Sequence, residues 1–285
     1  MMLRKDMLSL AARRLSEKGV DDGGYEAREL MGLAMGADCR GPEFLEHLKE
    51  EPAVGEEKRF NELLEERLRG RPLQYILGEW EFYGIRIKVG EGVLIPRQDT
   101  EMMVEICESR LKGRRDLRVI DLCAGSGCIA LAMEKRLSCQ KIAAVEKSPK
   151  ALSFLRENIS LHGSSVDPVE GDVLDPGTVG RLFDADLILC NPPYLTSMDM
   201  EHLQTEVGFE PEEALFGGED GLDFYRGITR LWKERLLPGG MMLYEIGKGQ
   251  EDDVMAVMIQ HGLQNVRCLK DHNGIYRNVI GVKPE

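Results

Sequence analysis

The chain has 285 residues, of which 42% are hydrophobic and 31% charged, so it can bury a sizeable core and is not a disordered polypeptide. Its formal net charge of −13 disfavours a surface that grips nucleic-acid phosphates. Seven scattered cysteines without a Cys-x-x-Cys pair predict reduced thiols, and five histidines without ligand spacing predict that no metal is bound.

No apolar run is long enough to span a bilayer. The first residues, Met1 to Asp6, lack the apolar region of a signal peptide. We therefore expect a cytoplasmic protein that does not enter a membrane, and we expect a monomer.

Residues 1–76 carry a helical period and little strand signal, which predicts a small helical bundle. Before any family is considered, this domain could equally prop up the rest of the chain or bind a partner. Its predicted apolar stripes are Leu8, Leu10, Ala11 and Leu15; Ala27, Leu30, Met31 and Ala34; Phe44, Leu45 and Leu48; and Phe60, Leu63, Leu64 and Leu68.

Residues 77–100 change character and form the predicted linker between domains. Residues 80–89 alternate around a central Gly84, which predicts a β-hairpin. Residues 93–97 follow as an extended segment that leads up to Pro96.

Residues 101–285 alternate strand and helix signals and form the third predicted domain. Strands are expected at residues 117–122, 141–145, 186–190, 241–246, 266–270 and 275–282, with a further short strand ending at 171–173. Helices are expected at residues 128–136, 149–161, 221–237 and 252–261. Repeated βα units predict an α/β fold with a doubly wound, mostly parallel, seven-stranded sheet, whose last two strands could pair antiparallel at one edge.

A glycine-rich turn with the sequence Asp-Leu-Cys-Ala-Gly-Ser-Gly joins the first of these strands to its helix. Glycine lets the backbone approach a ligand, and the helix N-terminus offers free N–H groups. Glu146 ends the next strand, where a carboxylate suits a ribose diol. Asp172, with Val173, could face an adenine amino group, although an ordinary turn carboxylate explains Asp172 about as well. The candidate cofactor-binding residues are Asp121, Cys123, Ala124, Gly125, Ser126, Gly127, Glu146, Asp172, Val173 and Asn191.

Asn191, Pro192, Pro193 and Tyr194 follow a short buried strand and form what we call the Asn-Pro-Pro-Tyr corner. Each proline fixes φ and removes a backbone N–H, so the local carbonyls lack nearby donors. Such a corner can accept both hydrogens of a planar NH₂ group. A tight turn is the ordinary reading of Pro-Pro, but the glycine-rich turn upstream is a second, independent signal of a site.

The glycines Gly125 and Gly127 with Ala130 also fit a dinucleotide-binding fingerprint. Asp121, placed to meet a cationic amino-acid tail, favours S-adenosylmethionine instead. The Asn-Pro-Pro-Tyr corner supports the same choice, because it closes the fourth strand, which lies beside the first in sheets of this kind.

Together these residues resemble the release-factor glutamine methyltransferase family (PrmC/HemK). The resemblance runs from about Leu63 to Val282 and is weaker over the helical domain. It rests on residues 71–78, 82–84 and 93–101, on the two sites above, and on residues 209–222, 237–240 and 245–247. It implies the fold of a Rossmann-like, class I S-adenosylmethionine-dependent methyltransferase.

The chain departs from the family pattern at four positions. Cys123 replaces a usual glycine, Glu146 a usual aspartate, Val173 an aromatic residue and Gln98 a proline. None of these changes removes a group that the chemistry requires.

The resemblance implies methyl transfer from S-adenosyl-L-methionine, leaving S-adenosyl-L-homocysteine, to the side-chain nitrogen (N5) of a glutamine. The acceptor would be the glutamine of the Gly-Gly-Gln loop of class I peptide chain release factors, which the helical domain would help to recognise. Asn191 and the Pro192 carbonyl would hold the acceptor NH₂. Pro193 would border the amide, and Tyr194 and Phe82 would clamp it.

Three other readings stay open. The acceptor could be a ribosomal-protein glutamine or an adenine amino group, although the net charge of −13 weighs against nucleic acid. The chain could be a nicotinamide-dependent oxidoreductase, or a module that binds the cofactor without turnover.

Overall fold

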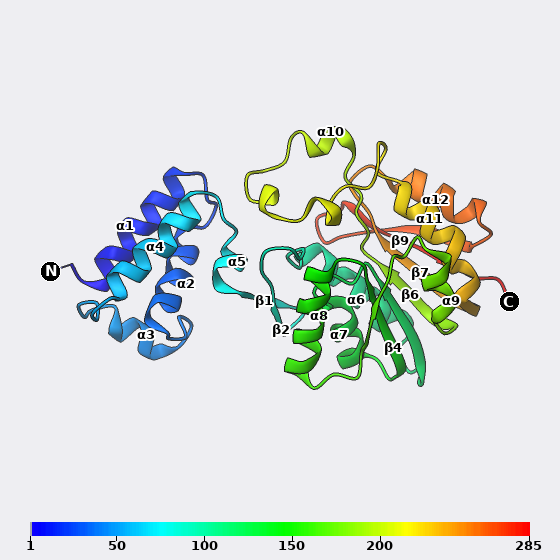
Figure 1. Cartoon of the computed structure of the whole chain (residues 1–285), viewed down its shortest axis with the longest axis horizontal. Coiled ribbons are helices and arrows are strands. Elements are labelled where there is room, and N and C mark those ends of the chain that lie inside the picture. Colours follow the sequence, from blue (N-terminus) through cyan, green and yellow to red (C-terminus); the bar gives the residue numbers. More distant parts are fainter. Residues whose placement is uncertain (1) are drawn as a thin grey trace. The chain divides into compact units, whose positions relative to one another are not determined.

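The structure is a computed structural model that describes residues 2–285. The chain forms two compact units (Figure 1). The first runs to Glu79 and includes Thr205–Phe209, and the second comprises Trp80–Gln204 and Glu210–Glu285. Met1, the first residue of the predicted helical domain, lies outside the described residues. The predicted boundaries at residues 76 and 100 stay predictions.

The first unit consists of helices α1 (Arg4–Glu17), α2 (Gly23–Met35), α3 (Pro42–His47), α4 (Glu56–Leu68) and α5 (Leu73–Leu77). The Asp22 side chain caps α2 by accepting from the Tyr25 N–H at 2.9 Å. The predicted stripes are buried in the main, but Leu10 and Leu45 are 51% and 54% exposed. The buried stripe of α1 instead follows four-residue spacing through Met7, Ala11 and Leu15.

Buried ion pairs tie this unit together. The Arg4 Nη2 donates to Glu56 Oε2 at 2.8 Å, and both side chains are buried. Arg67, which is 3% exposed, pairs with Glu26 and with Glu206 of the segment Thr205–Phe209. Removing one partner of such a pair would leave an uncompensated buried charge, so these contacts fix the segment within the unit.

The predicted hairpin is formed by β1 (Glu79–Phe82) and β2 (Ile85–Lys88), and all of it except Glu79 belongs to the second unit. Tyr83 and Gly84 make its turn with φ values of 49° and 72°. Phe82, Ile85 and Ile87 are almost fully buried in the hydrophobic core of the second unit.

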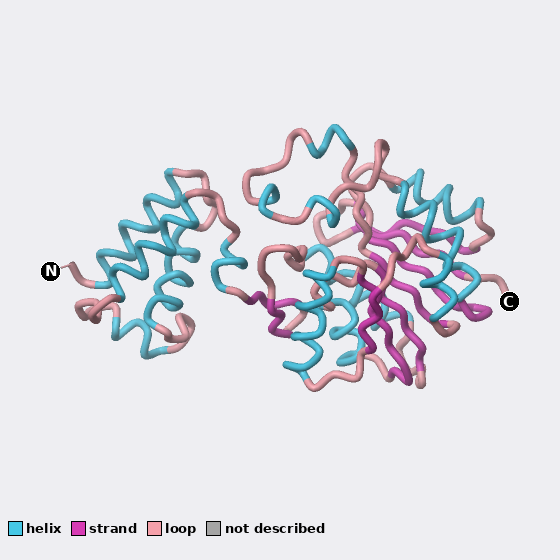
Figure 2. The backbone as a smooth tube through the Cα atoms, viewed as in Figure 1, coloured by secondary structure: helices cyan, strands magenta, loops and turns pink. Residues whose placement is uncertain are grey.

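A sheet with helices around it forms the centre of the second unit (Figure 2). It has seven strands in the order β5-β4-β3-β6-β7-β9-β8. The strands from β5 to β7 are parallel to their neighbours, and β9 runs antiparallel between β7 and β8. The strands are β3 (Leu117–Leu122), β4 (Cys139–Glu146), β5 (Asp167–Glu170), β6 (Ala185–Cys190), β7 (Leu236–Glu245), β8 (Gln264–Lys270) and β9 (Tyr276–Val282). This confirms the predicted doubly wound sheet.

Successive strand residues enter different cores, as a sheet buried on both faces requires. Val119 packs with one core and Ile120 with the other. The first core contains side chains of α6 (Gln98–Arg110), α7 (Cys128–Arg136) and α8 (Pro149–His162). The second contains those of α9 (Pro176–Arg181), α11 (Asp223–Trp232) and α12 (Glu251–Gln260).

Several features differ from the sequence analysis. Helix α9 was not predicted, and the short strand expected to end at residues 171–173 is β5, which ends at Glu170. Helix α6 was not predicted, although Thr100, Met103, Val104 and Cys107 form its buried stripe. The helix expected at 221–237 ends at Trp232, and β7 already begins at Leu236. A register shift against β6 accommodates the Pro-Gly-Gly segment that follows Leu237.

A long connection follows β6 and contains α10 (Ser197–Met200) and the short 3₁₀ turns η1 (Val207–Phe209) and η2 (Glu212–Ala214). A third 3₁₀ turn, η3 (Lys233–Arg235), precedes β7. Among residues 2–285, none of the helices has the length and apolar character needed to cross a membrane.

Candidate active site

The carboxyl ends of β3, β4 and β6 meet at one edge of the sheet. The chain runs outward through β3, β4 and β5 and then returns to β6 on the other side of β3. Ligands of open α/β sheets bind at such a reversal of strand order. The sheet order therefore brings the glycine-rich turn, Glu146 and Asn191 together, as the sequence analysis predicted for the first and fourth strands.

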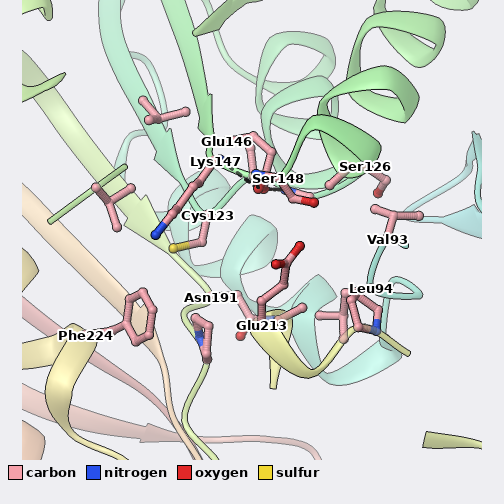
Figure 3. Close-up of a pocket in the computed structure, with 18 of the residues that line it drawn as sticks. Val93, Leu94, Cys123, Ser126, Glu146, Lys147, Ser148, Asn191, Glu213 and Phe224 are labelled. Carbon is pink, nitrogen blue, oxygen red and sulfur yellow. Dashed lines mark hydrogen bonds between the residues drawn. The ribbon is translucent and has the colours of Figure 1, made fainter. Parts of the chain in front are cut away.

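A cavity of about 510 Å³ lies at this edge (Figure 3). That volume is in the usual range for a small-molecule site. The predicted residues that line it are Cys123, Ala124, Gly125, Ser126, Glu146, Asp172, Val173, Asn191 and Pro193.

Asp121 lies beneath the turn rather than on the cavity wall. Its side chain is fully buried, and its Oδ2 accepts from the Ala130 N–H at 3.0 Å. Its Oδ1 has no hydrogen-bond partner among the described residues. Burial raises the pKa of this carboxyl group to about 8. Buried polar atoms are nearly always hydrogen-bonded, so the unpartnered Oδ1 is an exception in this site.

The turn itself contains three left-handed backbone conformations, at Cys123, Gly125 and Gly127. Gly127 has a φ of 82°, and a Cβ there would lie 2.3 Å from Leu155 Cδ1, so glycine permits the packing of α7 on α8. Cys123 has a φ of 56°, the left-handed region that glycine occupies freely. The cysteine thus adopts the shape that the family's usual glycine would give.

Glu146 fastens the turn to the end of β4. Its Oε2 accepts from the Gly125 N–H at 2.8 Å, and its Oε1 accepts from the N–H groups of Lys147 and Ser148 at 2.8 and 2.7 Å (Figure 3). Burial outweighs these bonds and raises its pKa. A carboxylate has about four lone-pair positions, so capacity remains for a hydroxyl group in the cavity.

Asp172 and Val173 line the cavity beyond β5. Asp172 pairs with Lys147 at 2.8 Å and accepts from the Leu174 N–H at 2.9 Å. Burial acts to raise the pKa of Asp172, but these two partners outweigh it and lower the pKa. The Val173 carbonyl accepts from Trp232 Nε1 at 2.8 Å, which holds this wall in place.

The Asn-Pro-Pro-Tyr corner directly follows β6. The Asn191 Nδ2 donates to Thr100 Oγ1 at 3.2 Å, and the side chain lines the cavity. Pro192 and Pro193 are buried. The Tyr194 carbonyl accepts from Gln250 Nε2 at 3.0 Å, and burial raises the pKa of its phenol to about 12.

Five predicted residues are not on the cavity wall. Four of them support it: Asp121 lies beneath the turn and Gly127 within it, and Pro192 and Tyr194 lie in the corner. The fifth, Phe82, is 1% exposed and packs in the core of the second unit. A side chain buried in this core does not reach the cavity, so the expected role of Phe82 as a clamp on the amide is not supported.

Two segments outside the βα units, residues 92–97 and 211–216, also line the cavity. Neither was predicted to contain site residues. They are joined by Glu210, which is buried, accepts from the Ile95 N–H at 3.0 Å and pairs with Arg97. These segments were noticed only as parts of the family resemblance. The added lining residues include Gly92, Val93, Leu94, Pro96, Arg97, Thr100, Pro211, Glu212, Glu213, Ala214, Phe216 and Phe224.

The lining carries more negative than positive charge. Glu146, Asp172, Glu212 and Glu213 supply carboxylates, whereas Arg97 and Lys147 are already engaged by Glu210 and Asp172. Such a cavity favours a cationic ligand over an anionic one. Among residues 2–285, no three His, Cys, Asp or Glu side chains are grouped to hold a metal ion; the prediction that no metal takes part stays a prediction.

Two known domain families match the chain, one over the helical unit and one mainly within the sheet unit. The PrmC N-terminal domain matches residues 6–78, and the methyltransferase small domain matches residues 98–209. A protein named release factor glutamine methyltransferase from Geobacter sulfurreducens is 40% identical over 270 residues, which cover 94% of this chain and 92% of that protein. A protein of the same name from Moorella thermoacetica is 36% identical, with 100% of both chains covered.

A solved methyltransferase from Pyrococcus furiosus resembles the fold with a TM-score of 0.56 and 20% identity, over 72% of this chain and 91% of that one. At this identity the likeness concerns the fold alone.

Proposed function

Because the chain belongs to the release factor glutamine methyltransferase family, we propose that it methylates the side-chain amide nitrogen (N5) of a glutamine in class I peptide chain release factors. The acceptor is the glutamine of their Gly-Gly-Gln loop, and the methyl donor is S-adenosylmethionine.

The residues around the cavity fit this donor. S-adenosylmethionine, when bound, supplies an electrophilic methyl group on a sulfonium sulfur and leaves S-adenosylhomocysteine as product. Asp121, beneath the turn, would balance the charge of the ammonium group, and Glu146 offers its spare capacity to the ribose hydroxyls. Cys123, Ala124, Gly125, Ser126 and Gly127 form the turn around the donor, and Asp172 and Val173 border the adenine.

The Asn-Pro-Pro-Tyr corner holds the acceptor. Asn191 turns its Nδ2 toward Thr100, so its Oδ1 can accept one N–H of the glutamine amide. The Pro192 carbonyl accepts the other, while Pro193 and Tyr194 border the amide plane. With both hydrogens held, the nitrogen lone pair is directed at the methyl carbon.

The rate then comes chiefly from positioning, which can supply about 7–11 kcal/mol of the barrier. Preorganised acceptors add to this. A separate general base is not required, because the methylated cationic amide is acidic and gives its proton to water or to a carbonyl.

The observation that carries this proposal is Asn191 on the cavity wall with its amide nitrogen already engaged. The test is mass spectrometry after incubation with methyl-labelled S-adenosylmethionine and three acceptors: a class I release factor, ribosomal proteins and nucleic acid. We expect one methyl group on the Gly-Gly-Gln glutamine of the release factor, and none with Asn191→Ala. Label on adenine or on a ribosomal protein, with an unlabelled release factor, would refute it.

A further inference from the structure

A buried carboxyl group lies behind Asn191 and has no part in the chemistry described above. Glu245 is the last residue of β7 and is 3% exposed. Cys190 of β6 pairs with Tyr244 of β7, so the next residues, Asn191 and Glu245, lie side by side at the strand ends. The Glu245 Oε2 finds no hydrogen-bond partner in the described part of the chain.

Thr100 connects this carboxyl group to the cavity. It lies in the first turn of α6, is 2% exposed and contributes to the cavity wall. Its hydroxyl accepts from Asn191 Nδ2 at 3.2 Å. Hydrogen bonding from the side chains of Thr100 and Asn191 lowers the pKa of Glu245, so both side chains lie against its carboxyl group. The three side chains therefore form one cluster of which Asn191 and Thr100 reach the cavity.

We propose that Glu245, acting with Thr100, is a positioning residue that fixes which end of the Asn191 amide faces the acceptor. This inference rests on the proposed function, because it assigns a role to the partners of Asn191 in that reaction.

The orientation matters because an asparagine amide carries an acceptor and a donor on the same fork. If the amide turned over, its NH₂ would face the NH₂ of the acceptor glutamine, and two donors cannot hydrogen-bond. An ionised carboxylate accepts only, so it repels Oδ1 and favours Nδ2 on its own side. Thr100 can then donate its one hydrogen to Glu245 and keep a lone pair for Nδ2.

Protonation of Glu245 would remove this selection, because a carboxylic acid can also donate. Burial raises the pKa of Glu245 to about 7, and the neighbouring Asp99 acts in the same direction, whereas Thr100, Arg277 and Asn191 lower it. Arg277 is itself paired with Asp99 at 3.1 Å. Titratable groups that also interact electrostatically with Glu245 are Cys128, Tyr194 and Tyr225. The active form is the ionised one, so turnover should fall as the pH drops through about 7.

The test uses the full chain with a release factor as methyl acceptor. It compares Glu245→Gln, Thr100→Val and the conservative Thr100→Ser, with Asn191→Ala as reference. For each variant kcat, KM for the release factor and its pH profile are measured, together with the Kd of S-adenosylhomocysteine. We expect Glu245→Gln and Thr100→Val to lower kcat about 100-fold through misplacement of the acceptor. The Kd should stay close to that of the wild type, the pH step near 7 should disappear in Glu245→Gln, and Thr100→Ser should retain turnover.

The possible failures are distinguishable. If Asn191→Ala is inactive while Glu245→Gln keeps both wild-type turnover and the pH step, this inference is overturned and the role of Asn191 stands. If Asn191→Ala itself keeps turnover, the proposed mechanism fails. If Glu245→Gln does not fold, the Thr100 pair decides, because equal activity of Val and Ser at this position contradicts the inference.

Discussion

At the scale of single residues, Asp121 combines full burial, one hydrogen bond and one unpartnered oxygen. Its pKa of about 8 lies above the ordinary value of 3.8. The stability that the protonated group contributes is therefore present in full below pH 3.8 and is lost as the pH rises through about 8. Binding of a charged ligand near Asp121 changes the pKa of this carboxyl group, so the affinity for that ligand depends on pH.

A cationic ligand beside Asp121 favours the charged carboxylate and lowers its pKa. At about pH 7 we therefore expect S-adenosylhomocysteine binding to expel about one proton per site, with affinity increasing by up to about tenfold per pH unit between roughly pH 6 and 8. Isothermal titration calorimetry in buffers of different ionisation enthalpy measures this proton release.

Asp121→Asn is the matched control, since it keeps the shape and removes the titration. It should bind more weakly and with an enthalpy that no longer depends on the buffer through this group. Glu146, whose pKa burial also raises, is the other carboxyl group that could contribute. Proton release that persists unchanged in Asp121→Asn would assign the effect to Glu146.

At the scale of elements, the connection between β6 and α11 packs directly on the Asn-Pro-Pro-Tyr corner. The Leu195 N–H donates to the Leu215 carbonyl and the Gly217 N–H donates to the Leu195 carbonyl, both at 2.8 Å. A Cβ on Gly217 would lie 2.7 Å from the Pro193 carbonyl oxygen and 2.7 Å from Tyr194 Cα. Glycine at this position thus permits two backbones to meet behind the site.

We expect Gly217→Ala to lower the free energy of unfolding by about 1–3 kcal/mol, because backbone atoms cannot move aside as a flexible side chain can. Turnover should fall as well, since the displaced backbone carries Asn191. Chemical denaturation and kcat measurements report the two effects.

Gly208→Ala, in the same connection, is the control. A Cβ on Gly208 would meet no heavy atom within 4 Å among the described residues. Its stability should therefore match that of the wild type. Equal stability and activity of the two variants would show that the contact at Gly217 does not constrain the corner.

At the scale of the whole molecule, the chain is divided between a helical unit and a sheet unit that carries the cavity. The helical unit includes Thr205–Phe209, a piece of the connection that follows the Asn-Pro-Pro-Tyr corner. We propose that this unit grips the release factor. The alternative is that it only holds this connection, through contacts such as Arg67 with Glu206. The expectations of a monomer and of no nucleic-acid binding stay predictions.

Removing residues 1–70 separates these possibilities. If the unit grips the protein substrate, KM for the release factor should rise far more than the Kd of S-adenosylhomocysteine, provided thermal unfolding shows that the truncated chain still folds. The full-length Glu206→Gln variant is the control, because it weakens the hold of Arg67 on the connection while keeping the helical unit. If Glu206→Gln and the truncation raise KM equally, the unit holds the connection and does not grip the substrate.

Local signals in the sequence were sufficient for much of this fold. Apolar runs, alternating periods and turn residues predicted the strands of the sheet and most of its helices, because each signal lies within about ten neighbouring residues. They also identified the glycine-rich turn, Glu146 and the Asn-Pro-Pro-Tyr corner, where unusual residues sit at strand ends. Helix α6 was not predicted, although its buried apolar residues have helical spacing. Leu10 was predicted to be buried but is exposed, because Leu8, Leu10, Ala11 and Leu15 do not all fit on one face of α1.

Only the tertiary structure decided which distant residues meet. Glu210 reaches Ile95 and Arg97, and Asn191 reaches Thr100, across more than ninety residues of sequence in each case. It also decided that Phe82 enters a core instead of the cavity, since an aromatic side chain next to a turn can serve either purpose. The sequence determined the elements and the chemical groups at their ends. Strand order, burial and side-chain packing, which no local pattern specifies, determined how those groups are combined.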